Sequence, residues 1–178
     1  MKKLNNLSES SFLKLFFLFF SSCFLIAAFF MPDRADMIPG LIRIIQNPTL
    51  SSTNAFSIGG YAATFLNMGL LGLICSVLYS IPGNKPTHEA VLVTILTIGF
   101  GSWGINILNI WPTIFGVMLY CIVKKEKFGA NVNAMLFSTG IAPLITDLMI
   151  RYPQTTVIGF NVPGVIMALV VGALIGFF

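Results

Sequence analysis

Three asparagines and one aspartate are the polar side chains whose positions suggest chemistry inside an apolar chain. Asn106 and Asn109 lie in the stretch GFGSWGINILNIWPTIFGVMLY, residues 99–120, which contains no charged residue. Asn67 lies in a second uncharged run, and Asp147 is the only acidic residue within the apolar runs. An unpaired polar group in hydrocarbon is costly, so each of these side chains needs a partner. They are expected either to bond to the protein itself or to line a path for a polar solute.

Each position has a structural explanation beside the functional one. Asn67 shares a helical face with Gly59 and Ala63 at four-residue spacing, so its amide either bonds across to a closely packed helix or contacts a solute. Arg151 follows Asp147 by four residues, which is the spacing of an ion pair on one helix. A carboxylate inside a membrane is nevertheless a functional candidate by default. Both interpretations stay open for these residues.

Motifs for other chemistry are absent from the sequence. The single histidine, His88, stands beside Glu89 in a short loop and provides neither a Ser/His/Asp set nor a zinc cluster. The cysteines lie in apolar runs without metal-ligand spacing, at Cys23, Cys75 and Cys121. The sequence contains no glycine-rich phosphate loop and no basic stripe interleaved with aromatic residues. We therefore expect a protein that is not an enzyme, has no metal or cofactor, and does not bind nucleic acid.

Membrane helices are the elements that must position these side chains. Of the 178 residues, 56% are hydrophobic and 9% are charged, whereas a soluble domain carries about 25% charged residues. A spanning helix needs about 17–25 predominantly apolar residues. Five runs reach or exceed this length, at residues 12–31, 55–79, 91–123, 129–150 and 162–178. The predicted fold class is all-α, a polytopic membrane helix bundle that forms a single transmembrane domain over residues 1–178.

The run 91–123 is too long for one crossing, and the distribution of positive charge favours two. Lysine and arginine prefer cytoplasmic loops. If the run crosses twice, all seven lysines lie inside and all three arginines outside, whereas one crossing leaves five on each side. The sequence thus predicts about six transmembrane helices with both ends cytoplasmic. As a helix, the eleven residues 91–101 rise only about 16 Å, which is well short of a hydrocarbon core of about 30 Å. Residues 91–101 and 107–123 are therefore expected to be two short spans, joined by a turn that lies within the membrane or in a recess.

The first run and the loop after it each allow two interpretations. Lys2 and Lys3 before an apolar run are typical of a signal peptide, and FFSSCFL weakly resembles a lipoprotein cleavage box. The run is long for a signal peptide and lacks a small-x-small cleavage site, so an uncleaved first helix is expected. Residues 32–54 are expected to form an extracytoplasmic loop. Their apolar residues recur at near-helical spacing, which fits either a short interfacial helix or an irregular packed loop.

The last two runs contain packing signals. Pro143 is expected to kink the helix over 129–150, with Ser138 and Thr139 satisfying the freed backbone groups one turn earlier. In the final run, small residues recur at every fourth position and form a ridge for close helix contact. The ridge consists of Gly164, Ala168, Gly172 and Gly176. It predicts a partner helix in this chain or in another one.

Several segments resemble a known family. SIGGYAATFLNMGLLGLI, NILNIWPTIFGVMLY followed by KKEKF, and AMLFSTGIAPLITDLM are similar to the bacterial membrane family called domain of unknown function 1576. The resemblance runs from about residue 45 to the end, and LNIWPTIFGVMLY is its most specific block. It implies a multi-pass membrane protein and no particular chemistry. It also implies that this chain is roughly the N-terminal half of a longer one, which the apolar ending VVGALIGFF fits.

Three classes of function follow from these features. Broken helices, buried amides and sparse intramembrane charge favour a permease or channel-like protein for a small neutral solute in the inner (plasma) membrane. A non-transporting structural or assembly subunit is the alternative, and the small-residue ridge supports it. An intramembrane enzyme is least favoured, because no catalytic set is present. The expected partners are the lipid bilayer and either the second half of the same protein or another copy in a homo-oligomer.

Overall fold

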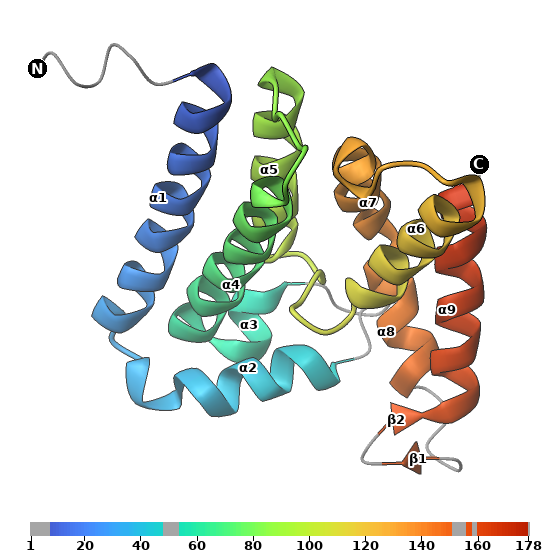
Figure 1. Ribbon diagram of the computed structural model, residues 1–178. Coiled ribbons are helices and arrows are strands. Elements are labelled where there is room, and N and C mark those ends of the chain that lie inside the picture. Colours follow the sequence, from blue (N-terminus) through green and yellow to red (C-terminus); the bar gives the residue numbers. More distant parts are fainter. Residues whose placement is uncertain (1–7, 48–53, 151–155, 158–159, 178) are drawn as a thin grey trace, which may run out of the picture.

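The computed structural model describes residues 8–47, 54–150, 156–157 and 160–177, which form a helical bundle with one small hairpin (Figure 1). The α-helices are α1 (Glu9–Phe30), α2 (Met37–Gln46), α3 (Ala55–Gly59), α4 (Tyr61–Ser80), α5 (His88–Phe100), α6 (Trp111–Lys124), α7 (Val132–Ser138), α8 (Ala142–Ile150) and α9 (Val162–Phe177). The 3₁₀ helices are η2 (Arg34–Asp36), η3 (Phe128–Asn131) and η4 (Thr139–Ile141). Strands β1 (Thr156–Val157) and β2 (Phe160–Asn161) pair antiparallel between α8 and α9. The predicted helical bundle is confirmed, and the hairpin is a small addition to it.

The first half of the bundle is built on two long apolar helices. α1 packs along α4, and α2 lies across the end where α1 stops and α4 starts (Figure 1). The two long helices approach closely, because a Cβ at Gly72 would meet the side chain of Ser21. Phe17 and Tyr79 meet near the other end of this pair, with ring centroids 5.1 Å apart. This pair is the frame against which the broken segment packs.

The loop at residues 32–54 contains a helix, as one of the two interpretations of its spacing predicted. α2 buries Leu41 and Ile44 against α3 and α4, while Ile38 and Ile42 are about half exposed. One face is therefore packed on protein and another is apolar and exposed, while the predicted position of this helix at a membrane interface stays a prediction.

The second predicted span is two helices rather than one. α3 ends at Gly59 and α4 begins at Tyr61, and Gly60 between them has φ 88° and ψ 178°, a conformation that only glycine adopts readily. The N–H groups of Tyr61 and Ala62 donate to the carboxylate of Asp33, at 2.7 and 3.1 Å. The helix is interrupted here because Asp33, 28 residues earlier in the sequence, accepts the free N–H groups at the start of α4.

The long apolar run is broken, as the sequence predicted. α5 and α6 contain 13 and 14 residues, a rise of about 20 Å each against a hydrocarbon core of about 30 Å. The start of α5 and the end of α6 lie at the same end of the bundle, so this segment enters and leaves from one side (Figure 1). Pro112 lies in the first turn of α6, where its missing N–H removes no helical bond.

Residues 128–150 form one bent helical segment that includes η4. The hydroxyls of Ser138 and Thr139 donate to the carbonyls of Met135 and Leu136, at 2.7 and 2.6 Å. These bonds lie one turn before Pro143, where the sequence predicted a kink with hydroxyl support. After the hairpin, α9 packs on α6 and α8.

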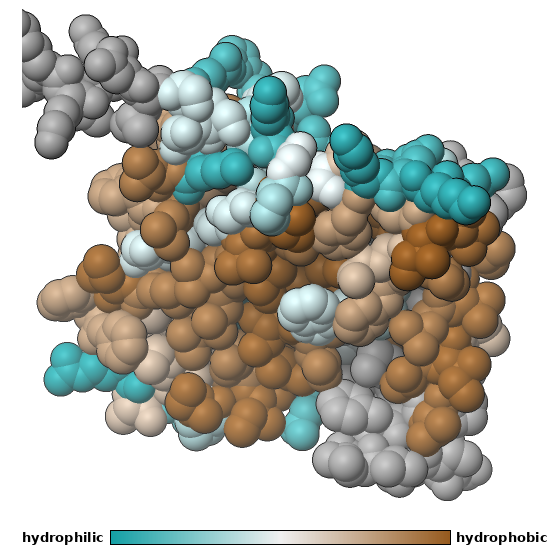
Figure 2. Space-filling model, in the orientation of Figure 1, coloured by the Kyte–Doolittle hydropathy of each residue, from teal (hydrophilic) through white to brown (hydrophobic). Residues whose placement is uncertain are grey.

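The surface has the polarity of a membrane protein. Hydrophilic residues gather along the end that carries the start of α5 and the end of α6, and a broad apolar belt covers the middle (Figure 2). Three helical segments among the described residues are long and apolar enough to cross a membrane, at Glu9–Phe30, Tyr61–Ser80 and Phe128–Asp147. Shorter apolar helices are His88–Phe100 and Trp111–Lys124.

Candidate functional site

Four buried polar side chains meet where the long run is broken. Asn67 comes from α4, Asn106 and Asn109 from the loop 101–110, and Thr146 from α8, and we call these four residues the amide site. Each is at most 2% exposed. Asn67 is the seventh residue of α4, so the site lies about 10 Å inside the end of that helix.

The loop reverses direction because its glycines permit it. Gly104 has φ 99°, in the left-handed region that favours glycine. The N–H groups of Trp103 and Ile105 both donate to the carbonyl of Phe100, at 2.8 and 3.1 Å, and these bonds end α5. Apart from Trp103, Ile107 and Leu108, the residues of this loop are buried, as irregular backbone inside a membrane protein must be.

Asn67 ties this loop to α4. Its Nδ2 donates to the carbonyls of Gly101 and Ile105, both at 2.8 Å, and its Oδ1 accepts the N–H of Ile107 at 3.2 Å. One side chain thereby satisfies three backbone groups that a continuous helix would have paired internally. The structure therefore shows the Asn67 amide bonded to the protein itself, at the break in the long apolar run.

Asn106 and Asn109 hold the turn before α6 by bonding reciprocally to its backbone. The Oδ1 of Asn106 accepts the N–H groups of Leu108 and Asn109 at 2.9 and 3.0 Å, and the Oδ1 of Asn109 accepts the N–H of Asn106 at 2.9 Å. The Nδ2 of Asn109 donates to the carbonyl of Gly104 and to the hydroxyl of Thr146, at 2.8 and 2.6 Å. Both amides therefore point into the bundle, beside the helix break.

One donor at the amide site has no hydrogen-bond partner among the described residues. It is the Nδ2 of Asn106, which is buried. The orientation of this amide follows from its oxygen, which accepts two backbone N–H groups. A buried donor without an acceptor costs about 1–3 kcal/mol, so this N–H is ready to bind any acceptor that reaches it.

Thr146 is the member of the site that the sequence analysis missed. A helical threonine usually bonds within its own turn, and Thr146 also lies 3.5 Å from the carbonyl of Ala142. Its neighbour Asp147, which the sequence singled out as a candidate, is 4% exposed. The predicted ion pair between Asp147 and Arg151 stays a prediction, because Arg151 lies outside the described residues.

The predicted small-residue ridge lies on α9, which packs on α6 and α8. The ridge residues are Gly164, Ala168, Gly172 and Gly176. The surroundings of these four positions lie outside the described part of the structure, so their role in close helix contact stays a prediction.

A family assignment agrees with this architecture. A family model described as Protein of unknown function (DUF1576) matches residues 33–178. The chain belongs to DUF1576. No curated protein and no solved structure matches the chain. The resemblance drawn from the sequence is confirmed, and its start moves from about residue 45 to residue 33.

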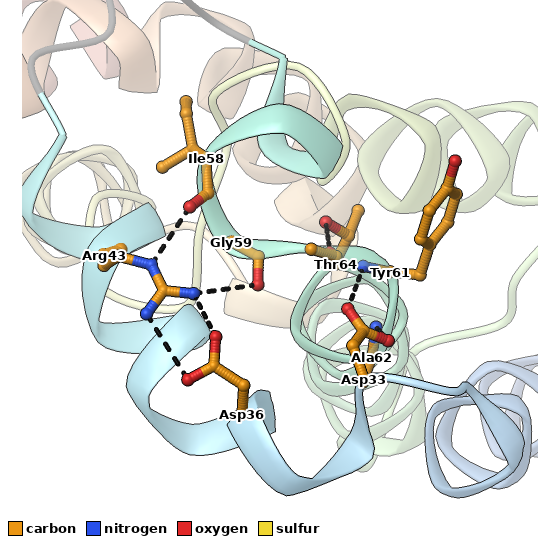
Figure 3. Close-up of polar contacts among 9 residues, drawn as sticks. Asp33, Asp36, Arg43, Ile58, Gly59, Tyr61, Ala62 and Thr64 are labelled. Carbon is orange, nitrogen blue, oxygen red and sulfur yellow. Dashed lines mark hydrogen bonds and ion pairs between the residues drawn. The ribbon is translucent and has the colours of Figure 1, made fainter.

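The DUF1576 match begins at Asp33 and so includes a second polar cluster, which we call the arginine latch (Figure 3). Arg43 of α2 pairs with Asp36 and donates from Nε to the carbonyl of Ile58 at 3.1 Å. Its Nη2 also lies 3.5 Å from the carbonyl oxygen of Gly59. The latch fastens α2 to the last residues of α3, beside the cap that Asp33 provides to α4.

Hydrogen bonding within the arginine latch lowers the pKa of its acidic residue, Asp36. The hydrogen bonds from Arg43 lower the pKa of Asp36 below its ordinary value of 3.8. Burial opposes this shift, and the positive charge of Arg43 adds a smaller lowering effect. The same pairing raises the pKa of Arg43. Both groups are charged at neutral pH, so the latch is an ion pair supported by backbone acceptors.

The remaining reactive side chains of this DUF1576 chain lie away from the amide site. His88 pairs with Glu9 through Nδ1 and Oε1 at 3.0 Å, on the exposed end of the bundle. Among the described residues, no three or more His, Cys, Asp or Glu side chains are grouped to hold a metal ion. The cysteines are free, with Cys75 and Cys121 buried and Cys23 exposed.

Proposed function

We propose that this protein is a permease or channel-like membrane protein for a small neutral solute, which contacts the amide site. The observation that carries the proposal is the buried Nδ2 of Asn106, a donor without an acceptor at a helix break inside the bundle. Helix breaks within the membrane are a common way to build solute sites, because their free backbone and amide groups offer hydrogen bonds where lipid offers none.

The chemistry of the amide site favours a solute without net charge. Its side chains are three amides and one hydroxyl, which are dipoles that bind hydroxyl, carbonyl or water-like groups. The buried acidic residue next to the amide site in sequence is Asp147, which directly follows Thr146. We propose no enzymatic activity, since the sequence provides no catalytic set for one.

We further propose that the protein lies in the inner (plasma) membrane with both ends cytoplasmic. One end of the bundle carries the starts of α1 and α5 and the end of α6, and the opposite end carries η2 and α2 (Figure 1). Lysines are found near the first set and arginines near the second. With the lysine end inside, this arrangement follows the positive-inside rule. In this proposal α1, α4, the bent segment 128–150 and α9 cross, and α5 and α6 are two short membrane helices.

A structural or assembly subunit is the second candidate. The observation in its favour is that Asn67 and Asn109 direct their described hydrogen bonds to groups of this chain. Such a subunit would pack against the second half of a longer chain or against another copy, with the ridge on α9 as a contact.

Solute flux into vesicles containing the full-length protein tests the proposal. Asn106→Ser keeps a side-chain oxygen for the N–H groups of Leu108 and Asn109, buries no charge and removes the unpaired Nδ2 donor, so flux should fall while the folded yield stays near normal. Ser102→Ala is the matched control, because the hydroxyl of Ser102, in the same loop, bonds to the carbonyl of Gly99 at the end of α5, at 2.7 Å. Folded protein that passes no tested water-sized or polyol solute would favour the structural subunit.

A further inference from the structure

A polar pocket of about 260 Å³ lies at the lysine end of the bundle, apart from the amide site. Its walls come from the loop between α4 and α5, from η3 and from the start of α7. The residues that matter are Asn84, Lys85, Thr87, Glu89, Gly129 and Asn133. The grooves between α5 and α7 and beside Trp111 are lined mainly by apolar side chains, so this pocket differs from them in its chemistry.

Asn84 gives the pocket a donor without an acceptor. The residue is 8% exposed, and its Nδ2 has no hydrogen-bond partner among the described residues. Its own backbone is fixed, because its N–H donates to the carbonyl of Ile81 at 3.1 Å. η3 closes on it from the other side, where a Cβ at Gly129 would lie 3.2 Å from the backbone nitrogen of Asn84.

The start of α5 adds further donors. Thr87 is the N-cap residue, and its side chain makes no capping bond to this helix of 13 residues. Thr87 and Glu89, on either side of the helix start, both line the pocket. The N-terminus of a helix carries partial positive charge and free N–H groups, which favour an anion.

The charged side chains of the pocket oppose each other. Lys85 is exposed and adds a positive charge, while Glu89 adds a negative one. The carboxylate of Glu89 lies 3.4 Å from the Nδ2 of Asn133, and the Oδ1 of Asn133 accepts the hydroxyl of Tyr79 at 2.7 Å. Glu89 is thereby held toward α7, and it is the group expected to weaken the binding of an anion.

We propose that this pocket binds a phosphate group, held by the Asn84 amide, the Lys85 ammonium group and the N-terminus of α5. A phosphate presents several acceptor oxygens with negative charge, and these three donors are the complement of that chemistry. The same group can come from an anionic lipid headgroup or from free phosphate, and the experiment separates the two sources.

The test uses the full chain in a maltoside detergent, which carries no phosphate. Its unfolding temperature is followed while inorganic phosphate replaces chloride at constant ionic strength, and separately while phosphatidylglycerol is added to the micelles. Stabilisation by inorganic phosphate identifies a free anion, and stabilisation by the lipid alone identifies a headgroup. In either case Lys85→Gln should weaken apparent binding about tenfold, the loss expected for one charge-assisted hydrogen bond.

Two further variants make the test specific. Glu89→Gln should strengthen binding, because it removes the opposing charge, and Asn84→Ala should abolish it. Lys127→Gln is the control, a lysine at the same end that does not line the pocket. The proposal is overturned if neither phosphate nor phosphatidylglycerol stabilises the protein, or if Lys127→Gln weakens binding as much as Lys85→Gln does.

Discussion

The side-chain amide of Asn109 donates to the hydroxyl of Thr146 across 2.6 Å, joining residues that lie 37 positions apart. This bond holds the loop between α5 and α6 against α8, while Asn67 holds the same loop against α4. The break is therefore fixed from two sides by side chains of other helices, and its geometry depends on both of them.

Removing the hydroxyl of Thr146 should loosen the break. Thr146→Val leaves the Nδ2 of Asn109 with the carbonyl of Gly104 as its one described acceptor, and we expect a loss of about 1–2 kcal/mol in the free energy of unfolding. Thr97→Val is the control, since that buried hydroxyl bonds to the carbonyl of Val93 in its own helix, at 2.9 Å. Denaturation in detergent measures both, and equal losses would contradict a special role for Thr146.

Asn67 should tolerate substitution less well than any amide at the exposed end. Asn67→Leu leaves two carbonyls and one N–H of the loop without partners in a buried setting, and we expect a loss of about 3 kcal/mol or more. Asn131→Ala removes bonds to Glu126 and Lys127 that water replaces, so it should cost less than about 1 kcal/mol. Similar losses for the two variants would mean that the loop does not depend on Asn67.

The break between α5 and α6 could be predicted from sequence because its cause is local. Gly101, Gly104 and Pro112 interrupt one apolar run, and the asparagines that serve the freed groups lie beside them. The break at Gly60 could not, because the cap that makes it stable comes from Asp33, far away along the chain. The pair Gly59 and Gly60 is a local turn signal, but nothing in its spacing shows that Asp33 would stabilise a break there.

The partner of Asn109 was missed for the same reason. Thr146 belongs to a different run, and nothing in the spacing of either residue indicates that α8 reaches the loop. Sequence patterns predicted which groups need partners, and tertiary packing decided which partners they have. The polar pocket at the lysine end illustrates this too, since Asn84 and Gly129 meet only after η3 has folded against the loop.

The arginine latch should weaken in acid. Because the pKa of Asp36 is lower in the folded protein than in the unfolded chain, its stabilising effect is present above the ordinary value of 3.8 and is lost as the pH falls below it. A spin label at the half-exposed position Ile42 should become more mobile in that range. Asp36→Asn should show the same mobility at neutral pH.

Arg43→Gln provides the comparison for the latch. It removes the ion pair and also the bond to the carbonyl of Ile58, so it should mobilise α2 more than Asp36→Asn does. It should also abolish the change with pH between neutral and acidic conditions. A label on Arg43→Gln that still responds to acid would assign the response to a different group.

The orientation of the bundle can be tested by cysteine labelling. On a background without the native cysteines, Glu126→Cys and Ala35→Cys introduce exposed thiols at opposite ends of the fold. We expect an impermeant reagent outside the cell to label position 35, and to label position 126 only after the membrane is opened. Labelling of both positions from outside would contradict the proposed topology.

The strictest test of the described fold is the single glycine between α3 and α4. Gly60→Ala places a Cβ against the carboxylate of Asp33 and forces a φ of 88° on a residue that disfavours it, so we expect a loss of about 2 kcal/mol or more. Gly99→Ala is the matched control, because Gly99 lies within α5 and a Cβ there meets nothing within 4 Å. That change should be neutral or stabilising by up to about 1 kcal/mol, since alanine favours a helix. The measurement is the unfolding temperature of the two variants in the same detergent, each compared with that of the unchanged protein. Equal stability of Gly60→Ala and Gly99→Ala would contradict both the left-handed conformation of Gly60 and its close contact with Asp33.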